Sequence, residues 1–378
     1  MQKLYLDVLY LLSCAANRKK AEKNKIDNMD LDALYSLCKE HSITALVSSV
    51  LTEHLKEKSE QYARWSQEQM KALYRDMNFA AERAKILAFL EENGIWYMPL
   101  KGIVLKEYYP HPELREFADN DILFDPEGAE QVKKYMLQNG YTLNDYGGEE
   151  YVDEYKKEPC FNFEMHRLLF HQNNAVFFPY YKEVKNRLIK DEGNDYGYHF
   201  SDEDFYVFMI AHAYRHYIDS GIGIRALLDI YIFNKAKEST LNYTYIENEL
   251  KQTDSDSYEK EMRYLAQKVF SGESHEYSLH EMNILEYYFN SKAYGTVENK
   301  VTNRMREFTG QDEFTFLSRV KYWWHRVFDS EVNRREFPKL YKSVVLIPLI
   351  PLIRSLRGIK KWKKLKTEND RLKELNKE

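Results

Sequence analysis

The chain has 378 residues, which exceeds the usual size of one domain and predicts two or more units with separate cores. Hydrophobic residues make up 44% of the sequence and charged residues 30%, which argues against an integral membrane protein. The three cysteines, Cys14, Cys38 and Cys160, are odd in number and lack Cys-x-x-Cys spacing. A disulfide scaffold or a zinc ribbon is therefore not expected, and a reducing cytoplasm is the favoured location.

The net charge of −5 combines two unlike parts. Residues 331–378 contain 14 Lys and Arg against 6 Asp and Glu, a charge of +8, which leaves −13 for residues 1–330. In this tail, a mostly apolar run at 344–353 is too short to span a bilayer, and seven basic residues follow it at 354–366. Three interpretations of 344–366 stay open: a solvated basic helix with its apolar part packed on the body, a peripheral contact with the inner membrane surface, or a contact with RNA.

The first 93 residues have helical periodicity almost throughout. Apolar residues from Leu4 to Leu12 recur three and four apart, so this segment is interpreted as an amphipathic helix rather than as a signal peptide. The same spacing predicts helices over 31–40, 43–56 and 62–93. The last of these ends at Asn93-Gly94, a typical helix C-cap.

The period changes after Gly94 and predicts a small α/β unit. Strands are predicted at 95–100, 116–124 and 161–166, and helices at 103–109 and 126–139. The last strand alternates strictly, so Glu164 and His166 share its polar face. Residues 144–158 are polar and predict no strand.

The chain is helical again from residue 202. Helices are predicted at 202–216, 224–236, 242–252, 257–270, 278–292 and 312–329. Together the elements predict an α+β fold, with a small mixed sheet embedded between helical regions. The expected division is a helical region at 1–79, an α/β core at 80–190, a helical domain at 191–330 and a tail at 331–378.

Acidic residues at two strands carry the chemistry. Asp119 and Asp121 are two apart on a predicted strand, so their carboxylates leave the same face and repel each other. A hard divalent cation such as Mg²⁺ prefers such oxygen ligands and would offset that repulsion. Glu164 is the best third carboxylate, with Asp153 and Glu158 in reserve. The alternative for the aspartates is a polar turn, and for Glu164 a solvent-facing position.

A phosphate site is predicted just upstream. Gly102 stands where a strand passes into a helix, where backbone N–H groups can approach a phosphate closely. Lys101 and Arg115 flank the two motifs and would neutralise phosphate charge. Ion pairs within the domain are an equally open role for both cations.

These motifs resemble a known family. The uncharacterised bacterial nucleotidyltransferase family, of the polymerase-β-like superfamily, is similar to this chain over six segments: Leu100–Arg115, Asp119–Leu123, Asn139–Tyr141, Phe163–Leu168, His212–His216 and Arg225–Asp229. The resemblance implies that Asp119 and Asp121 bind magnesium, with manganese as a substitute, that Glu164 is the third carboxylate, and that Gly102 positions a triphosphate.

Other polar residues are expected to support this site. His166 is expected to support the carboxylates rather than to bind metal, and a purely structural role for this histidine is the open alternative. Arg225 and Asp229, four apart on a helix, are expected to form an ion pair rather than to take part in catalysis. His212 and His216 are also four apart, but no glutamate follows His212, so a zinc site is not expected.

The sequence thus predicts a magnesium-dependent nucleotidyltransferase. It would transfer a nucleoside monophosphate from a nucleoside triphosphate, with ATP among the candidates, to a hydroxyl on a small molecule, RNA or protein. The alternative is an inactive module that keeps the fold for binding and uses its basic tail at a membrane.

Overall fold

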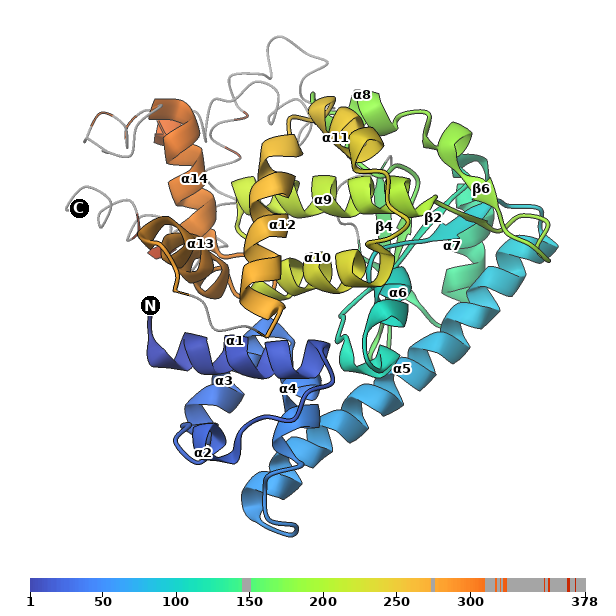
Figure 1. Cartoon of the computed structure of the whole chain (residues 1–378). Helices are drawn as coiled ribbons and strands as arrows, with labels where there is room; N and C mark the ends of the chain where they lie inside the picture. Colours follow the sequence, from blue (N-terminus) through green and yellow to red (C-terminus); the bar gives the residue numbers. More distant parts are fainter. Residues whose placement is uncertain are drawn as a thin grey trace. The chain divides into compact units, whose positions relative to one another are not determined.

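The computed structural model describes residues 1–144, 151–272 and 276–309, and a few single positions farther on (Figure 1). The chain divides into two compact units. The first comprises 1–214 and 224–289, and the second comprises 215–223 and the chain from Asn290 onward. The boundaries expected at 79, 190 and 330 stay predictions.

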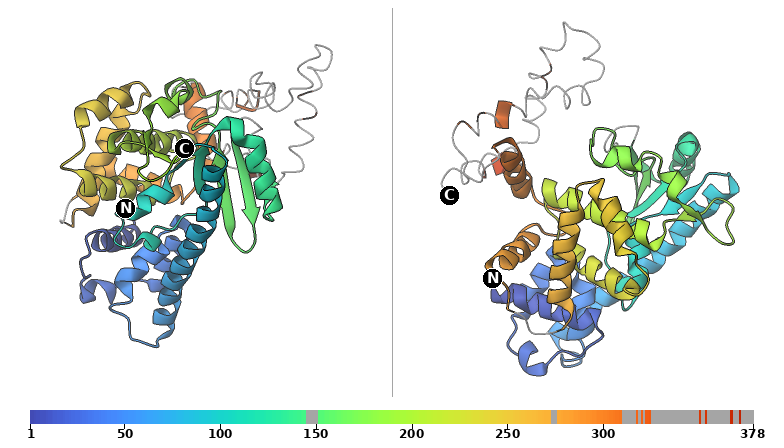
Figure 2. Two further views of the ribbon diagram at one scale, coloured as in Figure 1. Left: turned by 90° about the vertical axis from the view of Figure 1, so that its right-hand side faces the viewer. Right: turned by 45° about the horizontal axis from the view of Figure 1, so that its top comes forward.

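Five helices open the first unit: α1 (Lys3–Ala16), α2 (Lys23–Ile26), α3 (Leu31–His41), α4 (Thr44–Leu51) and α5 (Glu60–Glu92). Their ends follow local chemistry, since Asp30 caps the backbone N–H groups of α3 and Ser59 caps that of Tyr62 in α5. The predicted helices of this region are confirmed, although α4 ends at Leu51 rather than at residue 56. Figure 2 shows α5 as one continuous helix in both views.

A five-stranded mixed sheet follows α5. Its strands are β1 (Tyr97–Pro99), β2 (Asn120–Phe124), β3 (Thr142–Asn144), β4 (Val152–Lys157) and β5 (Phe161–His166), in the order β1-β2-β5-β4-β3. The β2–β5 pair is parallel, and the other pairs are antiparallel. The α+β expectation is confirmed. The polar segment was wrongly expected to lack strands, because β4 buries only Val152 and Tyr155 among charged residues.

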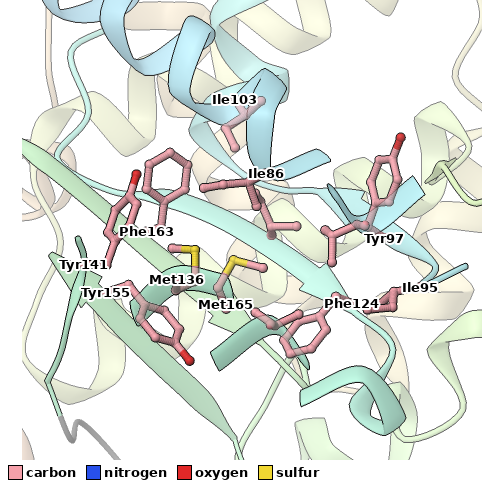
Figure 3. Packing of buried hydrophobic residues seen from close by; sticks show 13 residues of the cluster. Ile86, Ile95, Tyr97, Ile103, Phe124, Met136, Tyr141, Tyr155, Phe163 and Met165 are labelled. Carbon is pink, nitrogen blue, oxygen red and sulfur yellow. The ribbon is translucent and has the colours of Figure 1, made fainter. Parts of the chain in front are cut away.

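One face of the sheet forms an apolar core with two helices. Ile86 and Leu90 of α5 and Met136 of α7 (Ala129–Gln138) pack with strand residues that include Phe163 and Met165 (Figure 3). Phe163 and Met165 are fully buried, as the alternation in the last predicted strand requires. Asp121 of β2 and Glu164 of β5, which alternate with these core residues, therefore lie on the opposite face.

Short elements and five longer helices, α9 to α13, complete this part of the chain. They are α6 (Gly102–Leu105), α8 (Phe177–Tyr181), β6 (Ile189–Lys190), β7 (Tyr198–His199), α9 (Asp202–Asp219), α10 (Ile224–Lys237), α11 (Tyr243–Lys251), α12 (Asp256–Phe270) and α13 (Leu279–Asn290). Helices α9 to α13 confirm the helical prediction for this part of the chain. Helix α12 packs against both α1 and α10.

The second unit contains α14 (Val297–Thr309), which the sequence did not predict. Lys300 of this helix forms an ion pair with Asp219 at 2.8 Å. The helix expected at 312–329 and the tail segment 344–366 lie outside the described residues, apart from single positions. No helix in the described part of the chain is long and apolar enough to cross a membrane.

Candidate active site

The parallel pairing of β2 with β5 brings two carboxylates together. Asp121 of β2 lies directly opposite Glu164 of β5, so both side chains leave the polar face of the sheet. Asp121 is buried, whereas the Glu164 side chain is 27% exposed. The prediction placed both Asp119 and Asp121 on one strand, but β2 begins at Asn120. The strand alternation therefore applies to Asp121 and not to Asp119, which directly precedes β2.

Asp121 is the centre of a charged hydrogen-bond cluster. Its Oδ1 accepts from Lys101 Nζ at 2.6 Å and from His166 Nε2 at 2.8 Å. Burial alone would raise the pKa of Asp121, but the neighbouring Lys101 and His166 lower it overall. His166 Nε2 also lies 3.5 Å from Glu164 Oε2, so the imidazole bridges the two carboxylates. Its pKa is raised because these hydrogen bonds outweigh the effect of burial.

Lys101 reaches the cluster from a strained backbone. Its φ of +49° and ψ of −117° lie outside the regions that residues with a side chain normally occupy, a cost of about 1–3 kcal/mol. The backbone here is also tied to β2, because Leu100 N–H donates to the Asp121 carbonyl at 2.9 Å. Burial alone would lower the pKa of Lys101, but the negative charges of Asp121, Glu164 and Asp119 raise it.

Asp119 shares the electrostatic environment of the cluster. Burial and the charges of Asp121 and Glu164 raise its pKa to about 6, although Lys101 and Arg225 act in the opposite direction. Three carboxylates therefore lie near Lys101 and His166, and the charge of Arg225 also acts on Asp119. We call Asp119, Asp121 and Glu164 the carboxylate cluster.

The donor set suits a divalent cation. Among the described residues, one group of three side chains is arranged to ligate a metal: one ligand atom each from Asp121, Glu164 and His166 lie within 4.8 Å of one another. Carboxylate oxygens are the ligands preferred by Mg²⁺ and Mn²⁺, whereas the Nε2 of His166 is already hydrogen-bonded to Asp121. The excess negative charge at Asp119 supplies a second reason for a cation to bind here.

Arg115, which precedes β2 in the chain, is held by a buried ion pair. Its Nε and Nη2 donate to the two Asp229 oxygens at 2.8 and 2.7 Å, and Tyr109 OH donates to Asp229 Oδ1 at 2.7 Å. This geometry is bidentate, the strongest arrangement for the two groups. Gly102 lies against the same guanidinium, since a Cβ there would be 2.7 Å from Arg115 Nη1. The absence of a side chain at Gly102 thus lets Arg115 pack closely.

Helix α10 also contacts Glu116, the residue after Arg115. Arg225 Nη1 donates to the Glu116 carbonyl and to the Ser42 carbonyl, the latter at 3.4 Å. Glu116 Oε2 in turn accepts from Ala45 N–H at 2.9 Å. Arg225 and Asp229 therefore act on residues 115 and 116, directly upstream of the carboxylate cluster. Asp229 thus forms its ion pair with Arg115 rather than with Arg225, which binds backbone carbonyls instead.

Comparison with known proteins agrees with this geometry. A family model described as uncharacterised nucleotidyltransferase matches residues 27–271, well over half of the chain. The chain belongs to this nucleotidyltransferase family. The comparisons with curated proteins and with solved structures gave no significant match. The matched region includes the whole carboxylate cluster and the α10 contacts, while the basic tail lies beyond it.

The nucleotidyltransferase region contains polar contacts that the sequence did not indicate. Asn120 is fully buried on the core face of β2, and its Oδ1 accepts from Arg83 of α5 at 2.8 Å. Glu154 of β4 lies opposite Glu164, so a third acidic residue follows across the sheet, with Lys156 bound to it at 2.8 Å. Only the recognition of β4 as a strand would have revealed the position of Glu154.

The two reserve carboxylates have different surroundings. Asp153 accepts from Arg167 at 2.9 Å and lies opposite Met165, on the face away from Glu164. Glu158 follows the end of β4. The geometry therefore favours Glu164 over both as the third carboxylate.

Proposed function

We propose that the chain is a magnesium-dependent nucleotidyltransferase of the polymerase-β-like superfamily. It would transfer a nucleoside monophosphate from a nucleoside triphosphate to an acceptor hydroxyl and release pyrophosphate. The observation that carries this proposal is the in-register placement of Asp121 beside Glu164, with Asp119 one residue before β2. Family membership supports the same reaction class.

Asp119, Asp121 and Glu164 would hold the divalent cation, and His166 would steady two of these carboxylates through its bridging contact. A bound Mg²⁺ would supply positive charge beside the α-phosphate and lower the pKa of the acceptor hydroxyl. Manganese would substitute, since the nearby imidazole does not exclude it.

The remaining roles follow from charge and exposure. In the reaction the acceptor oxygen forms a bond to the α-phosphorus, and the bond from that phosphorus to the oxygen bridging it to the β-phosphate breaks. Glu164 is more exposed than Lys101 and His166, and it would take the acceptor proton. Lys101 would neutralise phosphate charge, and Gly102 would position the triphosphate at the start of α6.

Arg115 retains its proposed role beside the nucleotide, but its binding to Asp229 suggests that the role is indirect. Arg225 and Asp229 would support the site by fixing residues 115 and 116. The acidic residues 1–330, with a charge of −13, favour a small-molecule or protein acceptor over a large nucleic acid.

The test is incubation of the full chain with each α-³²P-labelled triphosphate and Mg²⁺ in a cell lysate, followed by separation of labelled small molecules, RNA and protein. We expect one labelled class to appear with the parent and with Glu130→Gln, which alters an exposed carboxylate on α7. The Asp119→Ala/Asp121→Ala variant is expected to give none. Equal labelling by the double variant would refute the assignment.

A further inference from the structure

Helix α5 carries a second apolar stripe that faces away from its core. The stripe follows a strict four-then-three spacing, and every member is exposed: Met70, Tyr74, Met77, Ala81, Ala84 and Ala88. This is the a and d pattern of a coiled coil, in which alternate steps of three and four residues keep one seam facing a partner helix. We call these six positions the α5 seam.

The α5 seam lies opposite the residues that anchor the helix in its own unit. Trp65, Phe79 and Ile86 are buried, and they occupy the positions farthest around the helix from the seam. In contrast, Met70, Tyr74 and Met77 are 64%, 67% and 63% exposed. Figure 1 shows α5 along the edge of its unit. Three large apolar side chains in one row are more than scattered surface residues provide.

The order of residue sizes along the seam indicates the partner. The large residues Met70, Tyr74 and Met77 occupy its first half, and only alanines, from Ala81 to Ala88, occupy the second. We propose that the α5 seam is the interface of a two-fold dimer, in which α5 of one chain packs antiparallel on α5 of a second copy. An isologous interface requires a surface that is complementary to itself, and this size gradient meets that requirement.

One register satisfies both the size pattern and coiled-coil geometry. With the two-fold axis near residue 79, Met70 meets the partner's Ala88, Tyr74 meets the partner's Ala84, and Met77 meets the partner's Ala81. Each contact joins one a position to one d position, as an antiparallel pair requires, and each joins a large side chain to a small one. From residue 70 to residue 88 the seam is roughly 27 Å long at the usual rise of a helix.

The edges of the seam set the salt dependence of this pairing. On one edge, the partly exposed Leu73 approaches the partner's Leu87 and extends the apolar contact. On the other edge, Lys71 approaches the partner's Lys85, but each lysine already pairs with a glutamate three residues earlier, at 2.9 and 2.8 Å. The remaining repulsion is screened by salt, so the dimer is expected to strengthen as ionic strength rises.

The first test measures the mass of the full chain by sedimentation equilibrium over a wide range of concentration. We expect a dimer of twice 45.3 kDa for the parent. Because charges at the centre of an interface disrupt it strongly, Tyr74→Glu should raise the dimer dissociation constant at least about thirtyfold. The matched control is Tyr264→Glu on α12, which is 63% exposed and outside the seam; it should remain dimeric. A monomeric parent, or equal effects of the two variants, would overturn the proposal.

The second test fixes the register by oxidation of cysteine variants in a Cys160→Ser background. Disulfides need Cα atoms within about 7 Å, so the Tyr74→Cys/Ala84→Cys variant should give a covalent dimer. Each single variant should give none, because two copies of either position lie roughly 15 Å apart along the axis in this register. Covalent dimers from the single variants would indicate parallel helices and overturn the antiparallel arrangement. Circular dichroism of each variant separates loss of pairing from loss of folding.

Discussion

The Arg115–Asp229 pair and the carboxylate cluster are two groups of charged residues near the start of β2, and they differ in charge balance. The Arg115–Asp229 pair joins one cation to one anion with two hydrogen bonds, and Tyr109 donates a third. The carboxylate cluster contains three acids against Lys101 and His166. Burial first, and then the charges of Asp121 and Glu164, raise the pKa of Asp119 to about 6, against the opposite effect of Lys101 and Arg225.

The balanced pair serves the fold, whereas the acidic cluster is suited to bind a cation. A closed, bidentate pair stabilises the fold only while both partners are present. A cluster with excess negative charge lowers stability until a cation joins it, which is the usual cost of a functional site. Mutations in the two groups should therefore have opposite effects on folding and activity.

The largest effect is expected for the Asp119→Ala/Asp121→Ala variant. Nucleotide transfer should fall at least about a thousandfold, because the charge that positions the cation and the phosphates is lost. The measurement is the initial rate with the labelled triphosphate that the parent uses. Glu130→Gln should retain the parent rate. If the double variant transferred nucleotide at a rate within a factor of ten of the parent rate, the carboxylate cluster would not have the catalytic role that distinguishes it from the Arg115–Asp229 pair.

Loss of one partner in the balanced pair should mainly reduce stability. Asp229→Ala leaves the buried Arg115 unpaired, and we expect the free energy of unfolding to fall by about 3–5 kcal/mol. Urea denaturation at neutral pH measures this change. The Arg115→Met/Asp229→Leu variant removes both charges and should recover most of the loss. If the double variant were as unstable as Asp229→Ala, the stabilising role of the pair would need another explanation.

Glu82 is a third buried charge, and like Asp229 it is paired with cations, so its effect on stability should depend on pH. Burial would raise its pKa, but Lys157, Lys85 and Tyr141 together lower it from 4.5 to about 2. Because its pKa is lower in the folded state, Glu82 stabilises the fold above pH 4.5 and loses this effect as the pH falls toward 2. Glu82→Gln should cost about 2 kcal/mol at pH 7, and its difference from the parent should disappear over that window. Urea denaturation at a series of pH values tests this, and a constant difference would contradict it.

The smallest expected effect is a gain in stability. Asp119→Asn removes one of three mutually repelling carboxylates, so the free energy of unfolding in the presence of EDTA should rise by about 1 kcal/mol. Thermal unfolding of the metal-free chain measures the change. A loss of similar size would show that the charge of Asp119 is already balanced without a cation.

The local part of the site could be predicted from the sequence. Strict alternation placed Glu164 and His166 on one face of a strand, and the structure confirms β5 at the predicted residues. The short distance between Asp121 and Glu164 depends on strand pairing, which a two-residue period does not specify. The family model matches residues 27–271, which include both carboxylates, but the pairing of their two strands became known only from the structure.

The contacts of longer range could not be predicted. Arg115 and Asp229 are 114 residues apart in the chain, and nothing in either local pattern connects them. The strand β4 was missed because its buried residues, Val152 and Tyr155, do not alternate. The exposed stripe of α5 has a four-then-three spacing that a buried helix face can also have, so its exposure became visible only when the core face of that helix was known.

The most direct test of the central claim is calorimetric titration of the full chain with ATP, GTP, CTP and UTP in the presence of Mg²⁺. The account predicts that at least one triphosphate binds the parent and Glu130→Gln, and that this binding is lost with EDTA and in the Asp119→Ala/Asp121→Ala variant. If no triphosphate binds the parent, or if one binds the double variant equally well, the carboxylate cluster is not a nucleotide site.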